Sequence, residues 1–191
     1  MNEAADIERA YTLLEKGTNR RSFLFGKVNK YSWVDTGSSF GLSDLLAAFL
    51  LGQLQAKDRV LAKRRRISEE YCELLMPLEA EFDFQCMRVP DDRKQAYHMF
   101  YVLFRSRRIR DCVLSALKEH DIHATFHYVP LHSSPAAARF SDVPAICPIT
   151  DDISGRLMRL PFYNGLSSAD IQRIADRLTV ALADATDQDD G

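Results

Sequence analysis

The chain has 191 residues, of which 46% are hydrophobic and 27% are charged, so it can bury a substantial core. Its formal net charge of −2 excludes a global attraction to nucleic acid or anionic membranes and leaves only local anion sites. The four cysteines show no CxxC spacing, which favours reduced thiols. The longest apolar run, residues 45–52, is too short to cross a bilayer, and the first residues are not signal-like. We therefore expect a soluble cytoplasmic protein.

The first predicted elements are a short helix and a basic loop. Apolar residues at positions 7, 10, 11 and 14 predict an amphipathic helix that Gly17 ends. The following stretch, KGTNRRSFLFGKVNKYSW over residues 16–33, mixes five cations with aromatic residues and has neither helix nor strand periodicity. A loop of this length is usually functional or disordered, and the aromatic residues argue against disorder.

A turn rich in glycine and serine, GSSFGLSD, occupies residues 37–44 just before the next predicted helix. Free N–H groups and the helix dipole at such a position favour a phosphate. An ordinary helix cap by Ser43, with Asp44 answering the dipole, explains the same residues equally well. The cations upstream make a phosphorylated ligand more plausible.

One long helix is expected from about Asp44 to Met76, apolar on all sides at first and on one side later. At about 1.5 Å per residue it would be about 45 Å long, enough to connect two domains. Pro77 would end it soon afterwards. Its basic run, KRRR at residues 63–66, is expected to be a solvated face that pairs with nearby carboxylates such as Glu69, and nucleic-acid binding is the weaker alternative.

The C-terminal half alternates strands and helices. The expected order is strand, helix, strand, short helix, strand and last helix, at residues 97–104, 109–120, 123–128, 153–158, 159–162 and 167–182. The nearly continuous apolar run at 97–104 predicts a strand covered on both faces. Ser167 and Asp170 form a capping-box pattern. From residue 84 onward we expect a two-layered α/β sandwich with helices on one face of a short sheet.

The histidines show no self-contained catalytic or metal-binding pattern. No pair has the HExxH arrangement, and His123 and His127 share one face of the predicted strand. That face is compatible with a metal or with a polar surface near a ligand. No GxSxG, Walker A or GxGxxG motif is present.

Four separated blocks of the sequence, taken together, resemble one enzyme family. In order, the blocks are KGTNRRSFLFGKVNKYSWVDTGSSFGLSDLLAAFLLGQLQ, YHMFYVLF, FHYVPLHSSPA and RLPFYNGLS. In this order they resemble the C-terminal half of the DegT/StrS-type sugar aminotransferases, most of all the dTDP-4-amino-4,6-dideoxygalactose transaminase type. The resemblance extends over nearly the whole chain to about Leu182.

That resemblance implies a pyridoxal phosphate enzyme of fold-type I, a homodimer with its active sites between subunits. It would transfer an amino group from glutamate to the 4-keto carbon of a nucleotide-linked 6-deoxy sugar, for surface-polysaccharide synthesis. The basic loop would reach the neighbouring subunit's cofactor. Cofactor-binding roles fall on Ser39, which stands where many relatives have an asparagine, and on Asn19 and Arg20. Substrate-binding roles fall on Tyr31, Trp33, His127 and His132.

The same resemblance implies that this chain holds half an active site. In the family, the Schiff-base lysine and the carboxylate facing the pyridinium nitrogen lie upstream of the matching part. None of the lysines matches the Schiff-base position; they are Lys16, Lys27, Lys30, Lys57, Lys63, Lys94 and Lys118. No residue is therefore expected to be catalytic by itself, and no metal is implied.

The expected organisation has four parts. They are a remnant of the large domain with the cofactor and substrate loop at residues 1–43, a long interdomain helix at 44–83, a small α/β domain at 84–185 and a disordered acidic tail at 186–191. Two functions remain open. The chain is the C-terminal part of a sugar aminotransferase that needs a lysine-bearing large domain, or it is a non-catalytic interaction domain that binds or modulates a full-length relative. Neither requires nucleic acid or a membrane.

Overall fold

The computed structural model describes residues 3, 6–140 and 146–187 and divides the chain into two compact units. Unit 1 covers residues 1–56 and unit 2 covers residues 57–191. The expected boundaries at residues 43 and 83 differ from this division, because the helix that begins at Asp44 belongs with the N-terminal unit. Among the described residues, no helix is both long and apolar enough to cross a membrane.

Among the described residues, unit 1 contains three helices and the basic loop. The helices are α1 (Asp6–Leu14), α2 (Arg20–Leu24) and α3 (Asp44–Gln55). None of the three contributes a buried residue, and Gly17 and Thr18 in the turn after α1 are the buried residues of the described part of this unit. The described part of unit 1 therefore has no hydrophobic core of its own.

The expected continuous helix from Asp44 to Met76 is wrong in one respect. It is interrupted at Ala56 (φ −86°, ψ 1°), where the chain leaves the helical conformation between α3 and α4 (Lys57–Leu75). The break falls where the apolar residues change from surrounding the helix to occupying one side of it. As expected, α4 ends shortly before Pro77, which lies in the 3-10 turn η1 (Met76–Leu78).

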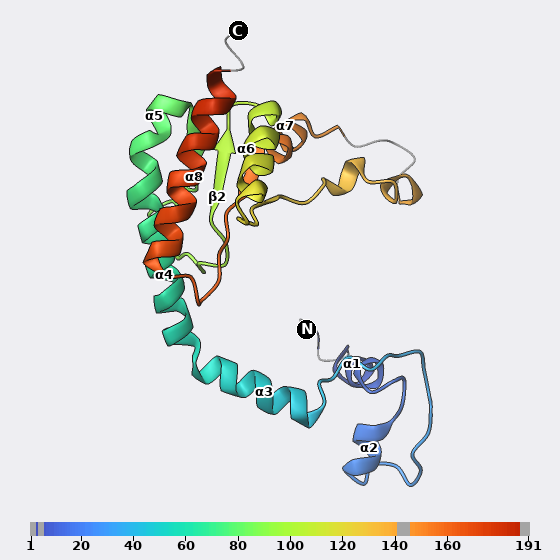
Figure 1. Ribbon diagram of the computed structural model, residues 1–191. Helices are drawn as coiled ribbons and strands as arrows, with labels where there is room; N and C mark the ends of the chain where they lie inside the picture. The colour runs from blue at the N-terminus through green and yellow to red at the C-terminus, as the bar shows by residue number, and fades with distance from the viewer. Residues whose placement is uncertain (1–2, 4–5, 141–145, 188–191) are drawn as a thin grey trace. The chain divides into compact units, whose positions relative to one another are not determined.

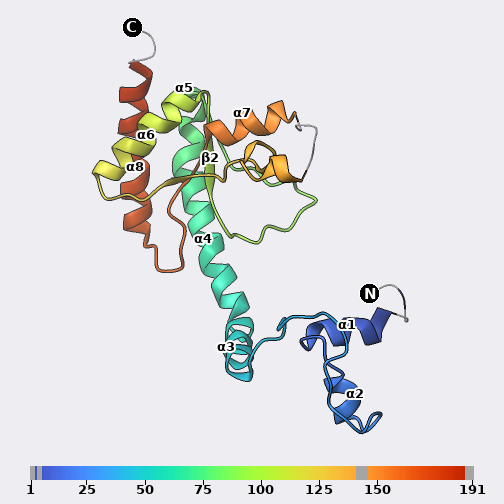
Figure 2. The ribbon, with the colours of Figure 1, turned by 90° about the vertical axis from the view of Figure 1, so that its right-hand side faces the viewer.

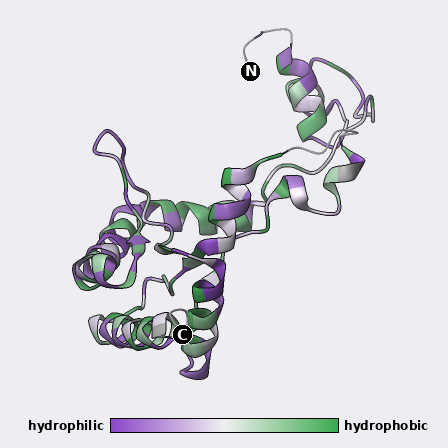
Figure 3. Cartoon of the chain, turned by 90° about the horizontal axis from the view of Figure 1, so that it is seen from above, coloured by the Kyte–Doolittle hydropathy of each residue, from purple (hydrophilic) through white to green (hydrophobic). Residues whose placement is uncertain are grey.

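Unit 2 is a two-layered α/β sandwich, as the sequence predicts. After η1, its helices and strands are α5 (Glu79–Phe82), β1 (Phe84–Cys86), β2 (Tyr101–Phe104), α6 (Arg107–Glu119), β3 (Thr125–Phe126), η2 (Leu131–Ser133), η3 (Ala137–Arg139), α7 (Pro148–Arg156), β4 (Leu157–Arg159) and α8 (Ser168–Asp187). Helix α8 packs against both α4 and α6 (Figures 1 and 2). These helices carry hydrophilic and hydrophobic residues (Figure 3), which is typical of a one-sided packing surface.

The sheet has the strand order β1-β2-β4-β3, and all neighbours are antiparallel. Strand register places Phe84 opposite Phe104 and Val102 opposite Met158. These four side chains are at most 3% exposed and form one core with buried residues of α4, α6 and α8. One face of the sheet is thus covered by helices.

A second contact joins α4 to the segments beside the sheet. The Tyr71 ring stacks on Phe100 with centroids 5.0 Å apart, and its hydroxyl donates to the carbonyl oxygen of Pro161 at 2.9 Å. Burial raises the pKa of this phenol well above its usual range. Tyr71 therefore stays neutral and packs as a core residue with one satisfied polar atom.

Three predicted strands are shorter or shifted in the structure. The run at 97–104 forms a strand only over Tyr101–Phe104, and the exposure of this strand alternates rather than being low on both faces. The positive φ of 48° at Tyr97 is incompatible with a strand at that residue. The strand expected at 159–162 lies at Leu157–Arg159, because Pro161 has no N–H to donate to a ladder. The strand expected at 123–128 is reduced to Thr125–Phe126.

The start of the last helix, α8, agrees with the prediction from the sequence, but its end does not. The capping box is confirmed: Ser167 Oγ donates to Asp170 Oδ2 at 2.5 Å, and the Asp170 N–H donates to Ser167 Oγ at 3.2 Å. The expected disorder from residue 186 is wrong for its first two residues, because α8 continues to Asp187 and buries Ala185. Residues 188–191 lie outside the described residues.

The outer edge of β1 is occupied by a side chain. Glu79 Oε1 accepts a hydrogen bond from the Cys86 N–H at 2.6 Å, and Glu79 Oε2 pairs with Arg88 at 2.5 Å. All four cysteines are free, as predicted, and burial raises the pKa of the Cys86 thiol to about 12. Cys86 therefore behaves as a small hydrophobic residue.

Candidate functional site

The base of the basic loop in unit 1 is closed by a glycine. Gly17 adopts φ +74° and donates its N–H to Thr12 at 2.8 Å, and its carbonyl oxygen accepts the N–H groups of Val34 and Asp35 at 2.8 and 2.9 Å. A Cβ at Gly17 would lie 1.7 Å from the carbonyl oxygen of Asp35. Only glycine fits this position, and both ends of the loop are therefore held together.

Asn19 closes the loop from within. Its backbone N–H donates to Ser32 O at 3.1 Å, its side-chain Nδ2 donates to Lys30 O at 3.0 Å, and its Oδ1 accepts the Ser32 N–H at 2.8 Å. The side-chain oxygen and one side-chain N–H of Asn19 are thus used in hydrogen bonds to the backbone of the loop. The sequence suggested a cofactor contact for Asn19 and missed this structural role, although a lone asparagine in a long loop is a signal for such side-chain to backbone bonds.

The other residues of the loop give unit 1 a basic and aromatic surface. Arg20 pairs with Glu15 at 2.9 Å and stays 55% exposed, and the Arg21 guanidinium lies 3.4 Å from the centre of the Tyr11 ring. Tyr31 and Trp33 are 55% and 75% exposed. The structure therefore brings Arg20, Tyr31 and Trp33 into one ordered segment with Asn19.

Ser39 and the start of α3 follow in the same unit. The backbone of Ser39 forms an isolated antiparallel β-bridge with Glu15. The exposed side chain of Ser39 makes no hydrogen bond to a described residue. Ser43 caps α3 by accepting the Leu46 N–H at 3.4 Å, so the ordinary cap expected from the sequence is present. The cap satisfies one of the free N–H groups. Phosphate binding here stays a prediction.

The two histidines expected near the substrate lie in unit 2, on the segment after β3. His127 is half-buried, and its buried Nδ1 has no hydrogen-bond partner among the described residues. Burial, together with the charge of Arg159, lowers the pKa of His127, so its imidazole is neutral at pH 7. His132 Nε2 lies 3.0 Å from Asp151 Oδ1. Asp151 and His127 line one pocket, so the structure brings the histidines to the same region.

His123 and His127, which the sequence placed on one face, line different pockets. His123 lines a pocket of about 450 Å³ together with His98, Arg159 and Asp170, whereas His127 lines the pocket of about 570 Å³ that Asp151 also borders. In the described part of the chain, no three side chains of histidine, cysteine, aspartate or glutamate are grouped closely enough to hold a metal ion.

The KRRR run of α4 has a role that the sequence did not predict. The expected ion pairs are present, from Arg65 to Glu69 at 2.7 Å and from Arg66 to Glu70 at 2.5 Å. The prediction of a wholly solvated face is wrong for Arg64 and Arg66. Arg64 Nε donates to Asn164 at 3.0 Å. Arg66 Nη2 donates to the carbonyl oxygen of Leu166 at 2.7 Å.

Residues 160–168 are thereby tied to α4. These partners lie about a hundred positions away in the sequence, so no local pattern could have revealed them.

Comparison with known structures places both units within one class of protein. The chain superimposes on the aminotransferase TlmJ from Streptoalloteichus hindustanus (TM-score 0.80, 21% identity, 96% of this chain and 46% of that one). It is similarly close to Helicobacter pylori PseC, an aminotransferase involved in the biosynthesis of pseudoaminic acid (0.79, 18%, 96% and 48%). A third match is Spr1654 from Streptococcus pneumoniae in its PLP-form (0.75, 16%, 97% and 45%). The fold is that of part of an aminotransferase.

The family follows from the sequence match. The model of the DegT/DnrJ/EryC1/StrS aminotransferase family matches residues 1–179, and this chain belongs to that family. It spans slightly less than half the length of the structural relatives named above. The family expected from the four sequence blocks is confirmed.

Proposed function

We propose that this chain is the C-terminal part of a pyridoxal phosphate-dependent nucleotide-sugar aminotransferase and acts only together with a lysine-bearing large domain. The observation that carries this proposal is the uneven coverage: 96% of the chain matches TlmJ, but only 46% of TlmJ is matched. The chain therefore accounts for one part of an enzyme of this class.

The residues present fit one side of the cofactor. Ser39 offers a hydroxyl without a partner among the described residues, close in sequence to the start of α3 and to the cations of the loop. Such groups suit a phosphate. All seven lysines are exposed, so none has the buried environment that activates a lysine amine for covalent bonding. When bound, the pyridoxal ring supplies the electron sink for amino transfer.

The remaining site residues would position the substrate. Tyr31 and Trp33 would offer exposed aromatic faces to the nucleotide base, as aromatic side chains do in other base-binding proteins. Asn19 would act indirectly by holding the loop in shape, and Arg20 would contribute positive charge. His127, neutral at pH 7, would exchange hydrogen bonds with a sugar hydroxyl, with His132 held beside it by Asp151.

The family assignment supports a proposal for the substrate and the setting. The amino donor would be glutamate, and the acceptor would be the 4-keto group of a nucleotide-linked 6-deoxy sugar. The amino sugar would be used to build surface polysaccharide, and the reaction would take place in the cytoplasm. The active form would be a dimer in which the loop of unit 1 reaches the neighbouring subunit's cofactor.

Reconstitution tests this function. The chain is mixed with a separately expressed large domain that carries the lysine, and amino transfer from glutamate to a 4-keto-6-deoxy nucleotide sugar is measured. Turnover is expected only in the mixture. Ser39→Ala should weaken cofactor retention by about 1.5–3 kcal/mol, the value of one hydrogen bond to a charged group. Ser115→Ala, an exposed serine on α6, is the matched control and should retain the cofactor fully.

A non-catalytic interaction domain is the second candidate. It is favoured by the apolar side chains that the chain leaves uncovered: Leu45 and Phe49 on α3, and Leu131 and Ile149 in unit 2, are 84%, 69%, 86% and 78% exposed. Apolar surfaces of this kind mark binding surfaces. Tight association with the large domain without turnover, and unchanged cofactor retention in Ser39→Ala, would favour this candidate over the enzyme.

A further inference from the structure

The pocket beside His127 contains a buried cation that the proposed function does not use. It has a volume of about 570 Å³, within the usual size of small-ligand sites. One face of α6 lines it with Arg107, Arg110, Asp111 and Leu114, which are spaced at i, i+3, i+4 and i+7. Helix α7 and residues 126–130 complete the walls.

Arg110 is 6% exposed and incompletely satisfied. Its Nε lies 2.8 Å from Asp111 Oδ1 but without hydrogen-bond geometry, and no hydrogen bond joins Arg110 to another described side chain. Asp111 Oδ2 also lies 3.6 Å from the Nε of Arg107. Two guanidinium groups therefore share one carboxylate that is itself 53% exposed. A buried guanidinium with five N–H donors is stable only where further acceptors reach it.

Other polar groups around the pocket could also receive a ligand. The buried Nδ1 of His127 has no partner among the described residues, and it can carry a proton and donate. The hydroxyls of Ser133 and Ser154 donate to the carbonyl oxygens of Pro130 and Asp151 at 3.2 and 3.1 Å, so these two donors are already used. The unsatisfied donors thus come from Arg110 and His127.

The charges of the lining set the charge of the ligand. Arg107 and Arg110 face Asp111 and Asp151, so a dianion would meet two carboxylates, whereas one negative charge can be placed against the arginines. Leu114, Phe126 and Val129 supply apolar wall beside them.

We infer that this pocket binds a small monocarboxylate. Its carboxylate would pair with Arg107 and Arg110, and its hydrocarbon part would lie against Leu114 and Val129. Planar guanidinium groups match the two oxygens of a carboxylate. The site needs only residues of unit 2, so it does not depend on the proposed aminotransferase function.

Titration of the 191-residue chain with benzoate and with benzamide tests the site, because the two probes share one shape and differ in charge. Benzoate should bind about tenfold more tightly than benzamide, as expected for charge-assisted hydrogen bonds. Shifts of the backbone amide signals of α6 and residues 126–130 should report the binding. Inorganic phosphate, which is mostly a dianion at pH 8, should bind more weakly than benzoate at that pH.

Substitutions of arginines inside and outside the pocket distinguish binding in the pocket from a general attraction of benzoate to arginine side chains. Arg107→Ala should weaken benzoate binding about threefold, because this side chain is 76% exposed and its charge is screened. Arg93→Ala is the matched control: it is 71% exposed, also lies beside an aspartate and does not line the pocket. It should bind benzoate as the parent chain does. Arg110→Met should abolish the preference for benzoate over benzamide.

Three results would overturn the inference. They are equal affinity for benzoate and benzamide, equal weakening by Arg93→Ala and Arg107→Ala, or phosphate binding tighter than benzoate. If Arg110→Met fails to fold, as judged by its circular dichroism spectrum, the comparison of Arg107→Ala with Arg93→Ala decides the question alone.

Discussion

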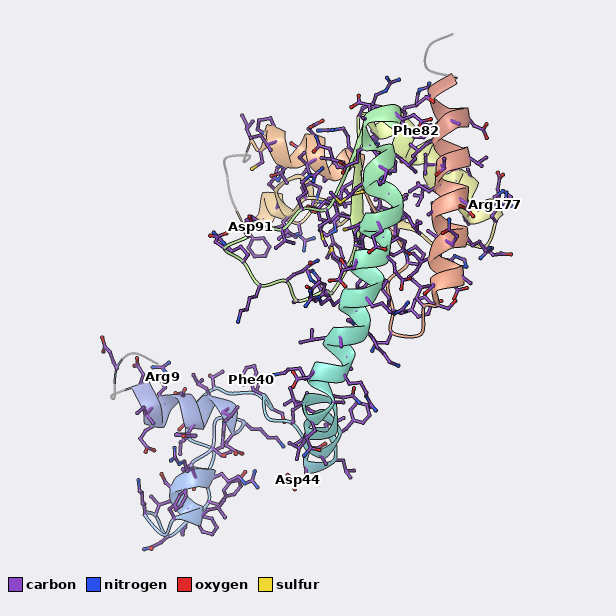
Figure 4. The ribbon with its side chains drawn as sticks, turned by 90° about the vertical axis from the view of Figure 1, so that its left-hand side faces the viewer. Arg9, Phe40, Asp44, Phe82, Asp91 and Arg177 are labelled. Atoms are coloured by element: carbon purple, nitrogen blue, oxygen red, sulfur yellow. The ribbon has the colours of Figure 1, made fainter. Side chains whose placement is uncertain are left out.

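Units 1 and 2 are ordered by different forces. In unit 2, residues such as Val113, Leu117, Leu178 and Leu182 are completely buried between helices and sheet. In unit 1, every residue of α3 is exposed, and Figure 4 shows the side chains from Asp44 onward on this helix. Hydrogen bonds at Gly17 and Asn19 hold unit 1 instead. In the one-sided helices of unit 2 the apolar side chains are buried by other parts of this chain. The apolar side chains that surround α3 are left exposed.

Truncation of one core leucine should show this difference most strongly. Leu117 is 0% exposed, so Leu117→Ala should lower the free energy of unfolding of unit 2 by about 2–5 kcal/mol, through lost burial and a new cavity. Leu45→Ala on α3, where the leucine is 84% exposed, should change it by no more than about 0.5 kcal/mol. Urea denaturation followed by circular dichroism measures both. Equal decreases in the free energy of unfolding would mean that Leu45 is packed in a core, which would contradict the difference between the two units.

The second test concerns polar contacts that fasten the layers of unit 2. Arg66→Ala removes the bonds to Leu166 O and Ser168 Oγ, so it should lower the free energy of unfolding by about 1–2 kcal/mol. Lys63→Ala in the same basic run should cost less than about 0.5 kcal/mol, because that lysine is exposed. The same denaturation experiment applies. If both variants behave alike, Arg66 is a solvated residue after all.

A glycine substitution tests the hydrogen-bonded order of unit 1. Gly17→Ala places a Cβ against Asp35 O, so the amides of Val34 and Asp35 should lose their protection from hydrogen exchange. Gly26→Ala has a similar φ of +69° but open space around it, so it should bear only the strain of a positive φ, about 1 kcal/mol. Protection in unit 2 should not change in either variant. Loss of unit 2 protection in Gly17→Ala would contradict the separation of the two units.

The smallest expected effect is the pH dependence of the α8 cap. The Ser167 hydroxyl and backbone N–H lower the pKa of Asp170, so the folded state favours the carboxylate. This contribution is present above the ordinary pKa of an aspartate and is lost as the pH falls through the lowered folded-state value. Asp170→Asn should therefore lower the Tm at pH 7 but leave it close to that of the parent chain at pH 2.

Asp184→Asn, which replaces an exposed aspartate on the same helix, is the control for the loss at pH 7. It should leave the Tm at pH 7 close to that of the parent chain. A pH-independent loss in Asp170→Asn would show that the carboxylate charge contributes nothing to the cap.

The sequence predicted most helices and strands of unit 2 because their patterns are local, but it predicted neither α5 nor β1. Helical spacing through Val113 and Leu117 marks α6, and the Ser167 and Asp170 pair marks the start of α8. Strand positions were less accurate, because they depend on backbone features such as the positive φ of Tyr97, which no pattern of hydrophobicity encodes. The residue at the break, Ala56, gave no signal either, since alanine favours a helix; only the change in apolar pattern coincides with the break.

The residues of the candidate site were predicted only from the family resemblance, which indicates positions in the sequence but not contacts. Resemblance pointed to Asn19 and His127, but the bonds that occupy the amide of Asn19 and the unpartnered Nδ1 of His127 depend on three-dimensional contacts. The sequence also gave no indication of Arg110, because its burial arises from α7 and the segment after β3 closing over α6.

The side chain of Glu79 limits how copies of this chain can associate. Strand β1 lies at the end of the sheet, where an unpaired N–H could recruit a strand from another molecule. Glu79 takes the N–H of Cys86, and Arg88 keeps charge beside it, so growth of the sheet by edge-to-edge addition is blocked at this end. Assembly through this end of the sheet must then use side-chain surfaces, whose shape selects a particular partner, rather than backbone pairing, which accepts almost any strand.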